Sequence, residues 1–318
     1  MGAQSIAFLF PGQGSQSVGM GRDLHDGLAA AAEVFERADA ALGVPLSRLC
    51  FEGPEEELQL TANTQPAILT TSIAALRHLE AAGIEPSLVA GHSLGEYSAL
   101  VAAGALDFED AVRLVRRRGE AMQQAVPVGE GAMAAVLGLG AADVERVTAA
   151  AARDCGAVCS VANLNAPEQI VIAGARAAVE RACELAAEAG AKRTVMLPVS
   201  APFHSPLMAP AREAMRPLLE QAEIRDPKVP VVCNVDAEAL TAGDAIRDAL
   251  VRQVDSPVRW VESMQVIVRR GVDQALEVGP GMVLTGLARR IDRQLGCSPA
   301  GTTDAIAKAV ANLSSAGA

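Results

Sequence analysis

The stretch Ser87–Leu100, SLVAGHSLGEYSAL, places a short apolar run before a Gly-x-Ser-x-Gly turn and a helical segment. Short apolar runs bounded by turn residues are typical of buried strands. Gly91 and Gly95 leave room for a sharp turn, and the strand-turn-helix order is that of a nucleophile elbow. In such a turn the Ser93 hydroxyl projects outward, while the Leu94 N–H heads the helix and can face an oxyanion. The stretch therefore predicts an α/β fold with Ser93 as nucleophile; the alternative is a tight turn without catalytic function.

The pattern of elements around this stretch indicates two units. Strand-like runs at Ser5–Phe10, Ser87–Ala90, Val229–Val235 and Gln274–Val278 alternate with helical stretches. In between, the order becomes βαββαβ, as in a ferredoxin-like unit, with elements predicted at 132–139, 141–155, 158–164, 169–173, 175–189 and 193–197. We therefore predict a large α/β-hydrolase-like domain of residues 1–128 and 198–318. A small ferredoxin-like subdomain of residues 129–197 is inserted into it, with a cleft between the two.

Composition excludes several functional classes. The chain has 318 residues, half of them hydrophobic, and a net charge of −11 without a Lys/Arg-rich run, so we expect no nucleic-acid partner. No apolar stretch is long enough to span a bilayer and no signal-peptide pattern is present, so we expect no membrane association and a cytoplasmic location. We also expect a monomer. The six cysteines form no Cys-x-x-Cys pair and only four histidines are available, which predicts reduced thiols and no metal site.

A serine nucleophile needs a base, and the candidates are His25, His78, His92 and His204. The first two fall in helical, surface-like segments. His92 adjoins Ser93, and neighbours across such a turn usually point apart. His204 lies in the loop Pro198–Pro206, whose prolines can hold an imidazole rigidly. Elimination favours His204 as general base; the alternative is a loop histidine with a structural role.

One arginine lies on the apolar face of a predicted helix that begins at Asp107, a plausible N-cap. At about 100° per residue, Arg116 and Arg117 turn to the sides, whereas Arg118 falls on the core-facing stripe. A buried guanidinium is unfavourable unless a carboxylate or phosphate receives it. Arg118 therefore indicates either an anionic substrate group or an internal Asp or Glu partner, and these residues alone leave the two open.

The loop Phe10–Gln16, FPGQGSQ, follows the first predicted strand. Its glycines let the backbone approach a ligand, so the Gln13 N–H could be the second donor of an oxyanion hole. The loop lacks the Lys-Ser/Thr of a phosphate-binding P-loop.

These motifs together resemble the family of malonyl-CoA:acyl carrier protein transacylases over nearly the whole chain. The matching segments are FPGQGSQ (Phe10–Gln16), TQPA (Thr64–Ala67), GHSLGEYSAL (Gly91–Leu100), RRG (Arg117–Gly119), NAPEQIVIAG (Asn165–Gly174), PFHSPLM (Pro202–Met208) and VGPGMVLTGL (Val278–Leu287). The resemblance implies Ser93 as acyl nucleophile, His204 as base and Arg118 as the residue that holds the malonyl carboxylate. It also implies an oxyanion hole of the Gln13 and Leu94 N–H groups.

Further implications of the resemblance concern the substrate pocket. Gln253 is expected near the site, orienting the histidine, with Asn163 close to it. His92 is a candidate for the substrate pocket only through its place next to Ser93, at most as a supporting contact. Leu94 and Phe203 go with malonyl rather than branched acyl groups in related acyltransferases. No cofactor is implied; the partners are malonyl-CoA and an acyl carrier protein. Because PFHSP also resembles polyketide acyltransferases, the carrier protein could serve fatty-acid or polyketide synthesis.

The expected mechanism is a ping-pong transfer through an acyl-serine, without a clear acidic third member. Two alternatives remain: a serine esterase or thioesterase using the same turn, and a non-catalytic subunit that binds carrier protein. A carrier protein could dock on local basic clusters, for which the candidates are Arg116 and Arg117, Arg269 and Arg270, or Arg289, Arg290 and Arg293.

Overall fold

The computed structural model describes residues 5–199 and 201–316, so Ser200 of the predicted histidine loop lies outside the described residues. Its larger sheet has the strand order β10-β9-β1-β2-β7-β8, parallel except for β8. The strands are β1 (Ile6–Phe10), β2 (Leu88–Gly91), β7 (Val231–Val232), β8 (Ala239–Leu240), β9 (Gln274–Glu277) and β10 (Gly296–Pro299). The predicted α/β class is confirmed.

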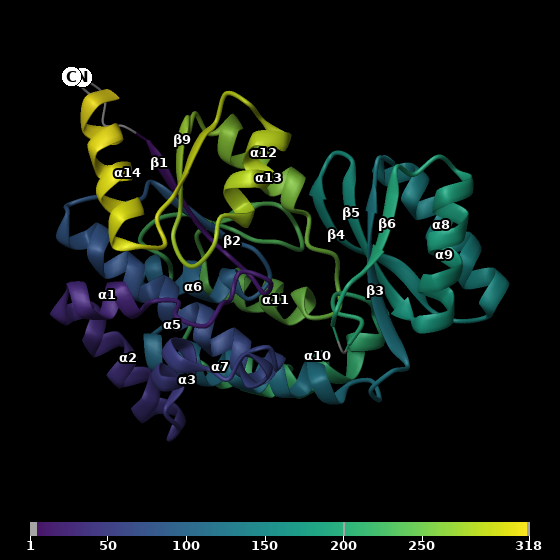
Figure 1. Cartoon of the computed structure of the whole chain (residues 1–318), viewed down its shortest axis with the longest axis horizontal. Coiled ribbons are helices and arrows are strands. Elements are labelled where there is room, and N and C mark those ends of the chain that lie inside the picture. The colour runs from purple at the N-terminus through teal and green to yellow at the C-terminus, as the bar shows by residue number, and fades with distance from the viewer. Residues whose placement is uncertain (1–4, 200, 317–318) are drawn as a thin grey trace.

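Helices cover both faces of this sheet (Figure 1). They are α1 (Arg22–Gly27), α2 (Ala29–Leu42), α3 (Leu46–Glu52), α4 (Glu55–Leu58), α5 (Thr61–Ala81), α6 (Gly95–Ala102), α7 (Phe108–Gln124), α10 (Ala209–Gln221), α11 (Gly243–Gln253), α12 (Trp260–Arg269), α13 (Val283–Ile291) and α14 (Thr303–Ala316). Because side chains alternate along a strand, Phe8 and Phe10 of β1 pack with residues of α5 and α7, and Leu9 packs with α12 and α13. Full burial on both faces explains why β1 is apolar throughout.

Strand β7 is shorter than the predicted Val229–Val235. Pro230 has no N–H to donate, and after Val232 the chain reverses through a turn closed by hydrogen bonds between Cys233 and Glu238 and between Ala237 and Cys233. The strands β8 and β10 were not predicted. Each is too short to show a clear apolar pattern.

The inserted unit is a four-stranded antiparallel sheet with the order β4-β5-β3-β6. Its elements are β3 (Gly131–Leu137), α8 (Ala141–Cys155), β4 (Cys159–Ala166), β5 (Gln169–Ala175), α9 (Arg176–Glu188) and β6 (Arg193–Met196). This confirms the predicted ferredoxin-like βαββαβ unit. We propose the domain divisions at residues 128/129 and 197/198, which enclose these elements.

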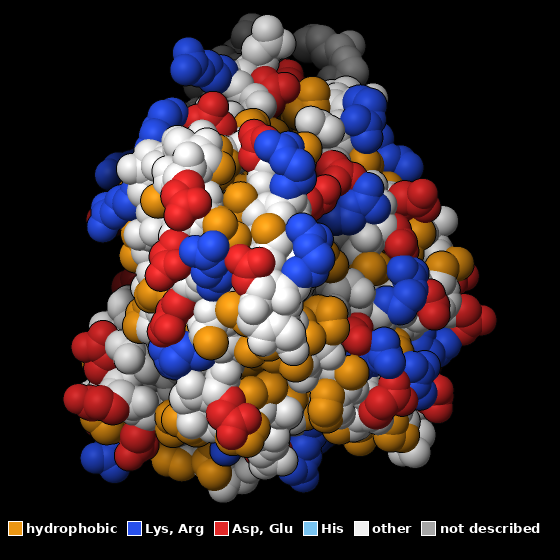
Figure 2. All heavy atoms as spheres, turned by 90° about the vertical axis from the view of Figure 1, so that its right-hand side faces the viewer, with side chains coloured by type: hydrophobic (Ala, Val, Ile, Leu, Met, Phe, Trp, Pro, Cys, Tyr) orange, Lys and Arg blue, Asp and Glu red, His pale blue; other side chains and the backbone are white. Residues whose placement is uncertain are grey.

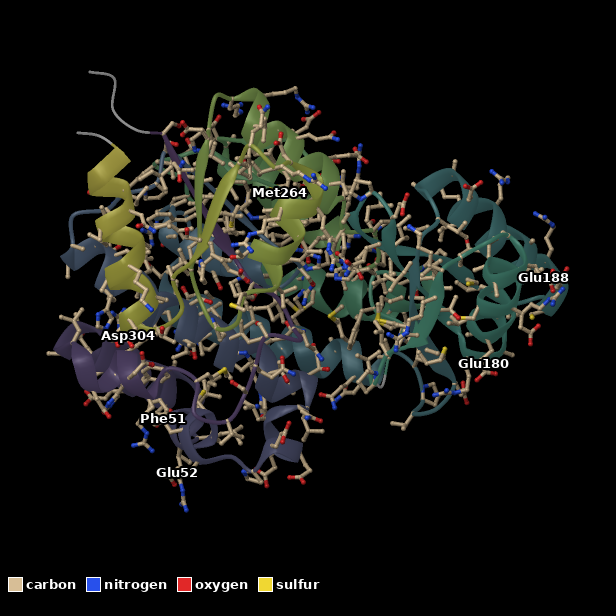
Figure 3. The ribbon with its side chains drawn as sticks, turned by 45° about the horizontal axis from the view of Figure 1, so that its top comes forward. Phe51, Glu52, Glu180, Glu188, Met264 and Asp304 are labelled. Atoms are coloured by element: carbon tan, nitrogen blue, oxygen red, sulfur yellow. The ribbon has the colours of Figure 1, made fainter. Side chains whose placement is uncertain are left out.

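The small unit extends away from the larger body, with α8 and α9 on its outer side (Figure 1). Val144 of α8 and Val179 of α9 pack on the sheet, whereas Glu180 and Glu188 of α9 lie at its far end (Figure 3). The sheet's opposite side faces the larger body, and β4 is joined to it by backbone hydrogen bonds. The Leu164 N–H donates to Val258 O at 2.9 Å, and the Val258 N–H donates to Ala162 O at 2.9 Å. These bonds hold the small sheet next to the carboxyl ends of β1 and β2.

No helix within residues 5–199 and 201–316 combines the length and the apolar character needed to cross a bilayer.

Candidate active site

The turn after β2 holds Ser93 in a left-handed backbone conformation, with φ of 53°. For a residue other than glycine this conformation costs about 1–2 kcal/mol, so the surroundings must enforce it. The two flanking glycines permit the tight turn. A Cβ on Gly91 would lie 1.9 Å from Gly95 C, and a Cβ on Gly95 would lie 2.2 Å from Phe10 O. Gly-x-Ser-x-Gly is therefore required here by backbone contacts on both sides of Ser93.

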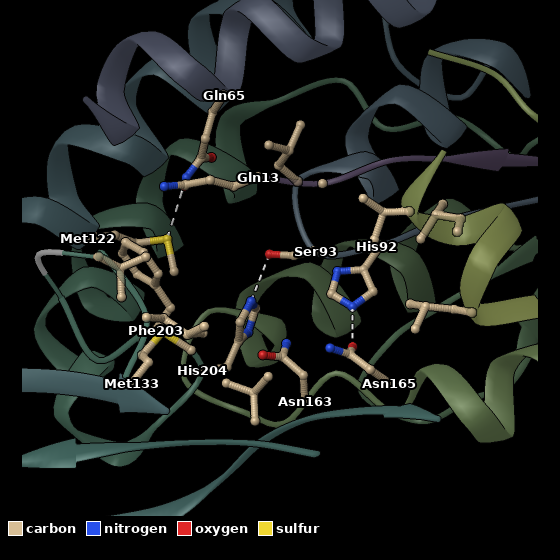
Figure 4. Close-up of a pocket in the computed structure, with 18 of the residues that line it drawn as sticks. Gln13, Gln65, His92, Ser93, Met122, Met133, Asn163, Asn165, Phe203 and His204 are labelled. Carbon is tan, nitrogen blue, oxygen red and sulfur yellow. Dashed lines mark hydrogen bonds between the residues drawn. The ribbon is translucent and has the colours of Figure 1, made fainter. Parts of the chain in front are cut away.

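Ser93 and His204 form a direct hydrogen bond, with 2.7 Å between Oγ and Nε2 (Figure 4). The other ring nitrogen of His204, Nδ1, lies 3.0 Å from Gln253 O and 3.1 Å from Ser256 O. Because carbonyl oxygens only accept, Nδ1 carries the proton and Nε2 accepts from the Ser93 hydroxyl. Two backbone carbonyls thus orient the imidazole, the function that a carboxylate has in a Ser-His-Asp triad.

His204 is almost fully buried and has φ of 57°. Burial, followed by the nearby Arg118 charge, lowers the pKa of His204 to about 3. The imidazole is therefore neutral at neutral pH and able to accept a proton. When His204 accepts a proton, the resulting imidazolium is unfavourable beside Arg118 unless a negative charge is also present in the site.

Arg118 of α7 points inward, as its place on the apolar stripe predicts, and only 1% of its surface is exposed. Its Nη1 donates to Gln65 Oε1 at 2.9 Å, and its Nη2 donates to Gln253 Oε1 at 2.8 Å and to Ser93 Oγ at 3.0 Å. Burial lowers its pKa, but a guanidinium stays charged in proteins. No carboxylate among the described residues forms an ion pair with Arg118. The buried Glu96 acts on its charge only indirectly, through Gln253, which accepts from Arg118 and donates to Glu96, so the internal-partner alternative is met without direct contact.

The neighbouring arginines behave differently. Arg116 and Arg117 turn to the sides of α7, and both pair with Glu120. Asp107 occupies the N-cap position of α7, as predicted, but its side chain makes no capping hydrogen bond. Its carboxylate instead pairs with Arg225, at 2.6 Å.

A cavity of about 190 Å³ lies beside Ser93, between the large sheet and the small one. All eight predicted site residues other than Gln253 line it: Gln13, His92, Ser93, Leu94, Arg118, Asn163, Phe203 and His204. Its remaining walls are mostly apolar and include Val171. Met122 and Met133 lie on the same side of the cavity as Phe203 (Figure 4). In the described lining, Arg118 is the one guanidinium and no carboxylate is present. The cavity thus offers a buried positive charge to a small acyl group with an anionic end.

Two backbone donors border the cavity near Ser93. Neither the Gln13 nor the Leu94 N–H has a hydrogen-bond partner among the described residues. The close approach of their loops again depends on glycine, because a Cβ on Gly12 would lie 2.5 Å from His92 O. Both N–H groups are therefore free to receive an oxyanion.

His92 also lines the cavity but makes no hydrogen bond to Ser93 Oγ. Its Nε2 lies 2.8 Å from Asn165 Oδ1, and its ring packs against Trp260 at a centroid distance of 5.4 Å. Because Asn165 Oδ1 accepts, Nε2 carries the proton and Nδ1 is the unprotonated nitrogen. Burial lowers the pKa of His92, so it is a neutral polar contact rather than a charge.

Several residues of the site were not predicted from the sequence. Gln65, which holds Arg118, lies inside the quoted TQPA segment and could have been found there. Asn234 Oδ1 accepts the Ser93 N–H at 2.7 Å, and Glu96 Oε2 accepts the Gln253 Nε2 at 3.0 Å. Glu96 is fully buried, which raises its pKa. No local pattern marks Asn234, whereas Glu96 lies inside the quoted GHSLGEYSAL segment and could have been found there.

Comparison with known proteins agrees with this geometry. The acyl transferase domain family model matches residues 7–314. The chain is 53% identical over 290 residues to the malonyl CoA-acyl carrier protein transacylase of Bacillus subtilis, covering 91% of each. It resembles the crystal structure of an acyl-carrier-protein S-malonyltransferase from Burkholderia pseudomallei, with a TM-score of 0.94, 50% identity, and coverage of 97% of this chain and 100% of that one. A malonyl-transacylase solved with a type II polyketide synthase acyl-carrier protein has a TM-score of 0.94 and 46% identity, covering 97% and 100%.

Proposed function

The chain belongs to the acyl transferase family, and on this premise we propose that it transfers a malonyl group from malonyl-CoA to the phosphopantetheine thiol of an acyl carrier protein. One observation carries the proposal. Arg118, buried and without a carboxylate partner among the described residues, lies 3.0 Å from Ser93 Oγ. An acyl group on Ser93 that ends in a carboxylate would supply the missing partner.

The first half-reaction forms a malonyl-serine. Ser93 Oγ attacks the thioester carbonyl of malonyl-CoA while His204 Nε2 takes the hydroxyl proton. The oxyanion of the tetrahedral intermediate accepts from the Gln13 and Leu94 N–H groups. When the intermediate collapses, the CoA sulfur leaves and takes the proton from His204, so that free CoA and the ester remain.

The second half-reaction reverses these steps. The carrier-protein thiol gives its proton to His204 and attacks the ester carbonyl, and Ser93 Oγ leaves with that proton. The thioester and the thiol supply all the chemistry, so we propose that no cofactor is needed. Ser93, His204 and Arg118 come from one chain, which supports a monomer as the active form.

The malonyl carboxylate has a second effect in this scheme. The Arg118 charge is one of the causes that depress the pKa of His204. A carboxylate seated on Arg118 offsets that charge and so makes His204 a stronger base when the correct substrate is bound. Malonyl groups thereby assist their own transfer, whereas an acetyl group offers no such compensation.

Docking of the carrier protein is proposed on α13. Arg116 and Arg117 pair with Glu120, so they are not free for a partner. Arg289, Arg290 and Arg293 are exposed and form no ion pair in the described part of the chain. The same helix lines the cavity through Leu284 and Leu287. Charges of both signs are mixed on the face that the small unit presents (Figure 2), which favours a local docking site over attraction by a whole face.

The location and pathway are also proposals. All six cysteines are unpaired thiols, and this supports a reducing compartment such as the cytoplasm. The named relatives include a transacylase solved with a polyketide carrier protein, so we propose carrier proteins of fatty-acid synthesis, with those of polyketide synthesis as a second possibility.

A direct test is a short incubation with malonyl-CoA, followed by intact and peptide mass spectrometry. We expect a malonyl adduct on the peptide that contains Ser93, absent in Ser93→Ala, and its discharge on addition of carrier protein. Release of CoA without an adduct or carrier protein would favour the esterase alternative. Carrier-protein binding without either reaction would favour a non-catalytic binding subunit.

A further inference from the structure

The main chain of Ser93 is held by side chains from distant segments. Its N–H donates to Asn234 Oδ1 at 2.7 Å, and its C=O accepts from Gln253 Nε2 at 2.9 Å. These partners lie 141 and 160 residues further along the chain. The left-handed conformation of Ser93 is thus fixed at both of its backbone polar groups.

Asn234 also binds the other end of the turn. Its Nδ2 donates to Gly91 O at 2.7 Å, so one amide brackets the residues on either side of His92. Only one orientation of the amide satisfies both contacts, because the oxygen must face the Ser93 N–H and the nitrogen must face a carbonyl. The ladder between β2 and β7 ends at Ala90 and Val232, and the Asn234 side chain continues it where the strand cannot.

Glu96 connects Asn234 and Gln253. Its Oε2 accepts from the Asn234 N–H at 3.0 Å and from Gln253 Nε2 at 3.0 Å. Glu96 is fully buried, and no ion pair reaches it among residues 5–199 and 201–316. Both hydrogen bonds of Glu96 Oε2 therefore go to Asn234 and Gln253, the two residues that hold the Ser93 main chain.

We propose that Asn234 is the positioning residue of the nucleophile, anchored by Glu96, and that it keeps Ser93 Oγ aimed at His204 and Arg118. The inference rests on the proposed role of Ser93 as nucleophile. Since Asn234 takes the Ser93 N–H, that group is not available to an oxyanion, in agreement with donors at Gln13 and Leu94. Asn234 itself does not line the cavity and acts through Ser93.

The test measures the reactivity of Ser93 separately from malonyl binding. An uncharged alkyl fluorophosphonate labels activated serines, and its rate can be followed by mass spectrometry. We expect Asn234→Ala to lower the labelling rate about 100-fold, as a displacement of about 1 Å would. In the transfer reaction, we expect Asn234→Ala to have a lower kcat for malonyl-CoA and a KM within about threefold of the wild-type value. A labelling rate within about threefold of wild type would overturn the proposal.

A matched control separates positioning from loss of stability. Asp39→Ala removes a side chain that accepts from both the N–H and the hydroxyl of Ser47, far from the cavity. It should lower Tm while leaving the labelling rate unchanged. If Asn234→Ala does not fold, Asn234→Leu serves, because a side chain of similar size can neither accept from Ser93 nor donate to Gly91 O. We expect labelling at least about tenfold slower, and a wild-type rate would count against the proposal.

The two hypotheses can fail separately. A wild-type protein that is labelled by the fluorophosphonate but forms no malonyl adduct would contradict the proposed function and leave the positioning role of Asn234 open to the same comparison of variants.

Discussion

Ser93 Oγ and His204 Nε2 lie 2.7 Å apart, and both residues have left-handed backbones, with φ of 53° and 57°. Neither is glycine, so each conformation is unfavourable by itself. Each is held by contacts from other segments: Ser93 by Asn234 and Gln253, and His204 by the carbonyls of Gln253 and Ser256. Holding Ser93 and His204 in these conformations lowers the stability of the fold but brings their side chains within hydrogen-bond distance. Such backbone strain is common at catalytic sites.

Replacement of Arg118 by alanine should remove selection for a carboxylate. Loss of a buried, charge-assisted hydrogen-bond partner is worth about 2–5 kcal/mol, so malonylation of Ser93 should slow about 30-fold or more. Acetylation should slow less, because an acetyl group makes no carboxylate contact. The measurement is the rate of adduct formation from malonyl-CoA and acetyl-CoA. Arg117→Ala, which removes an exposed partner of Glu120, is the control and should leave the ratio of the two rates unchanged.

The pH dependence of malonylation should lack an acid limb near the ordinary histidine pKa. Burial and the Arg118 charge lower the pKa of His204 from 6.5 to about 3, so the imidazole stays unprotonated and able to accept a proton as the pH falls through 6.5. Stopped-flow detection of the CoA released in the first turnover, at malonyl-CoA concentrations well below KM and between about pH 5 and pH 8, reports the free enzyme, in which no malonyl carboxylate offsets the Arg118 charge. A rate that halves with a midpoint near 6.5 would show that His204 is more easily protonated than the burial implies.

Two helical glycines should respond in opposite ways to alanine. Gly95 lies against the Phe10 carbonyl, where an added Cβ would stand 2.2 Å away, so Gly95→Ala should destabilise the protein and distort the turn at Ser93. Gly286 in α13 has open space around its Cβ position, and Gly286→Ala should stabilise by about 0.5–1 kcal/mol. Chemical denaturation of both variants provides the comparison. If both variants changed the free energy of unfolding equally, the close contact between Gly95 and the Phe10 carbonyl would not explain the effect of Gly95→Ala.

Charge reversal on α13 should affect only the second half-reaction. Arg289→Glu together with Arg290→Glu should raise the KM for carrier protein about tenfold or more, because the proposed docking on these arginines implies acidic groups on the carrier protein, which would then meet like charges. Malonylation of Ser93 by malonyl-CoA should stay unchanged. The matched control is Arg269→Glu with Arg270→Glu on α12. If that pair raises the KM and the α13 pair does not, the docking site lies on α12.

Local sequence was sufficient for the longer elements and for the position of the nucleophile, but not for the extent of β7 or for the short strands β8 and β10. The apolar runs at β1, β2 and β9, and the βαββαβ order between Gly131 and Met196, follow from side-chain periodicity. The Gly-x-Ser-x-Gly spacing reports a turn whose backbone contacts exclude side chains at Gly91 and Gly95. The inward direction of Arg118 follows from helical geometry alone. Each of these features depends on residues within a few positions of one another.

The partners of these side chains were decided only by the tertiary structure. Whether Arg118 faces a carboxylate or the amides of Gln65 and Gln253 depends on how α5, α7 and α11 pack. The choice of Asn234 to hold Ser93 depends on β7 lying beside β2. Hydrogen bonds form between whichever polar groups the packed core brings within about 3 Å, and no periodicity in the sequence encodes distances between segments more than a hundred residues apart. The sequence by itself determined the chemistry available at Ser93, and the fold decided which distant residues hold it in place.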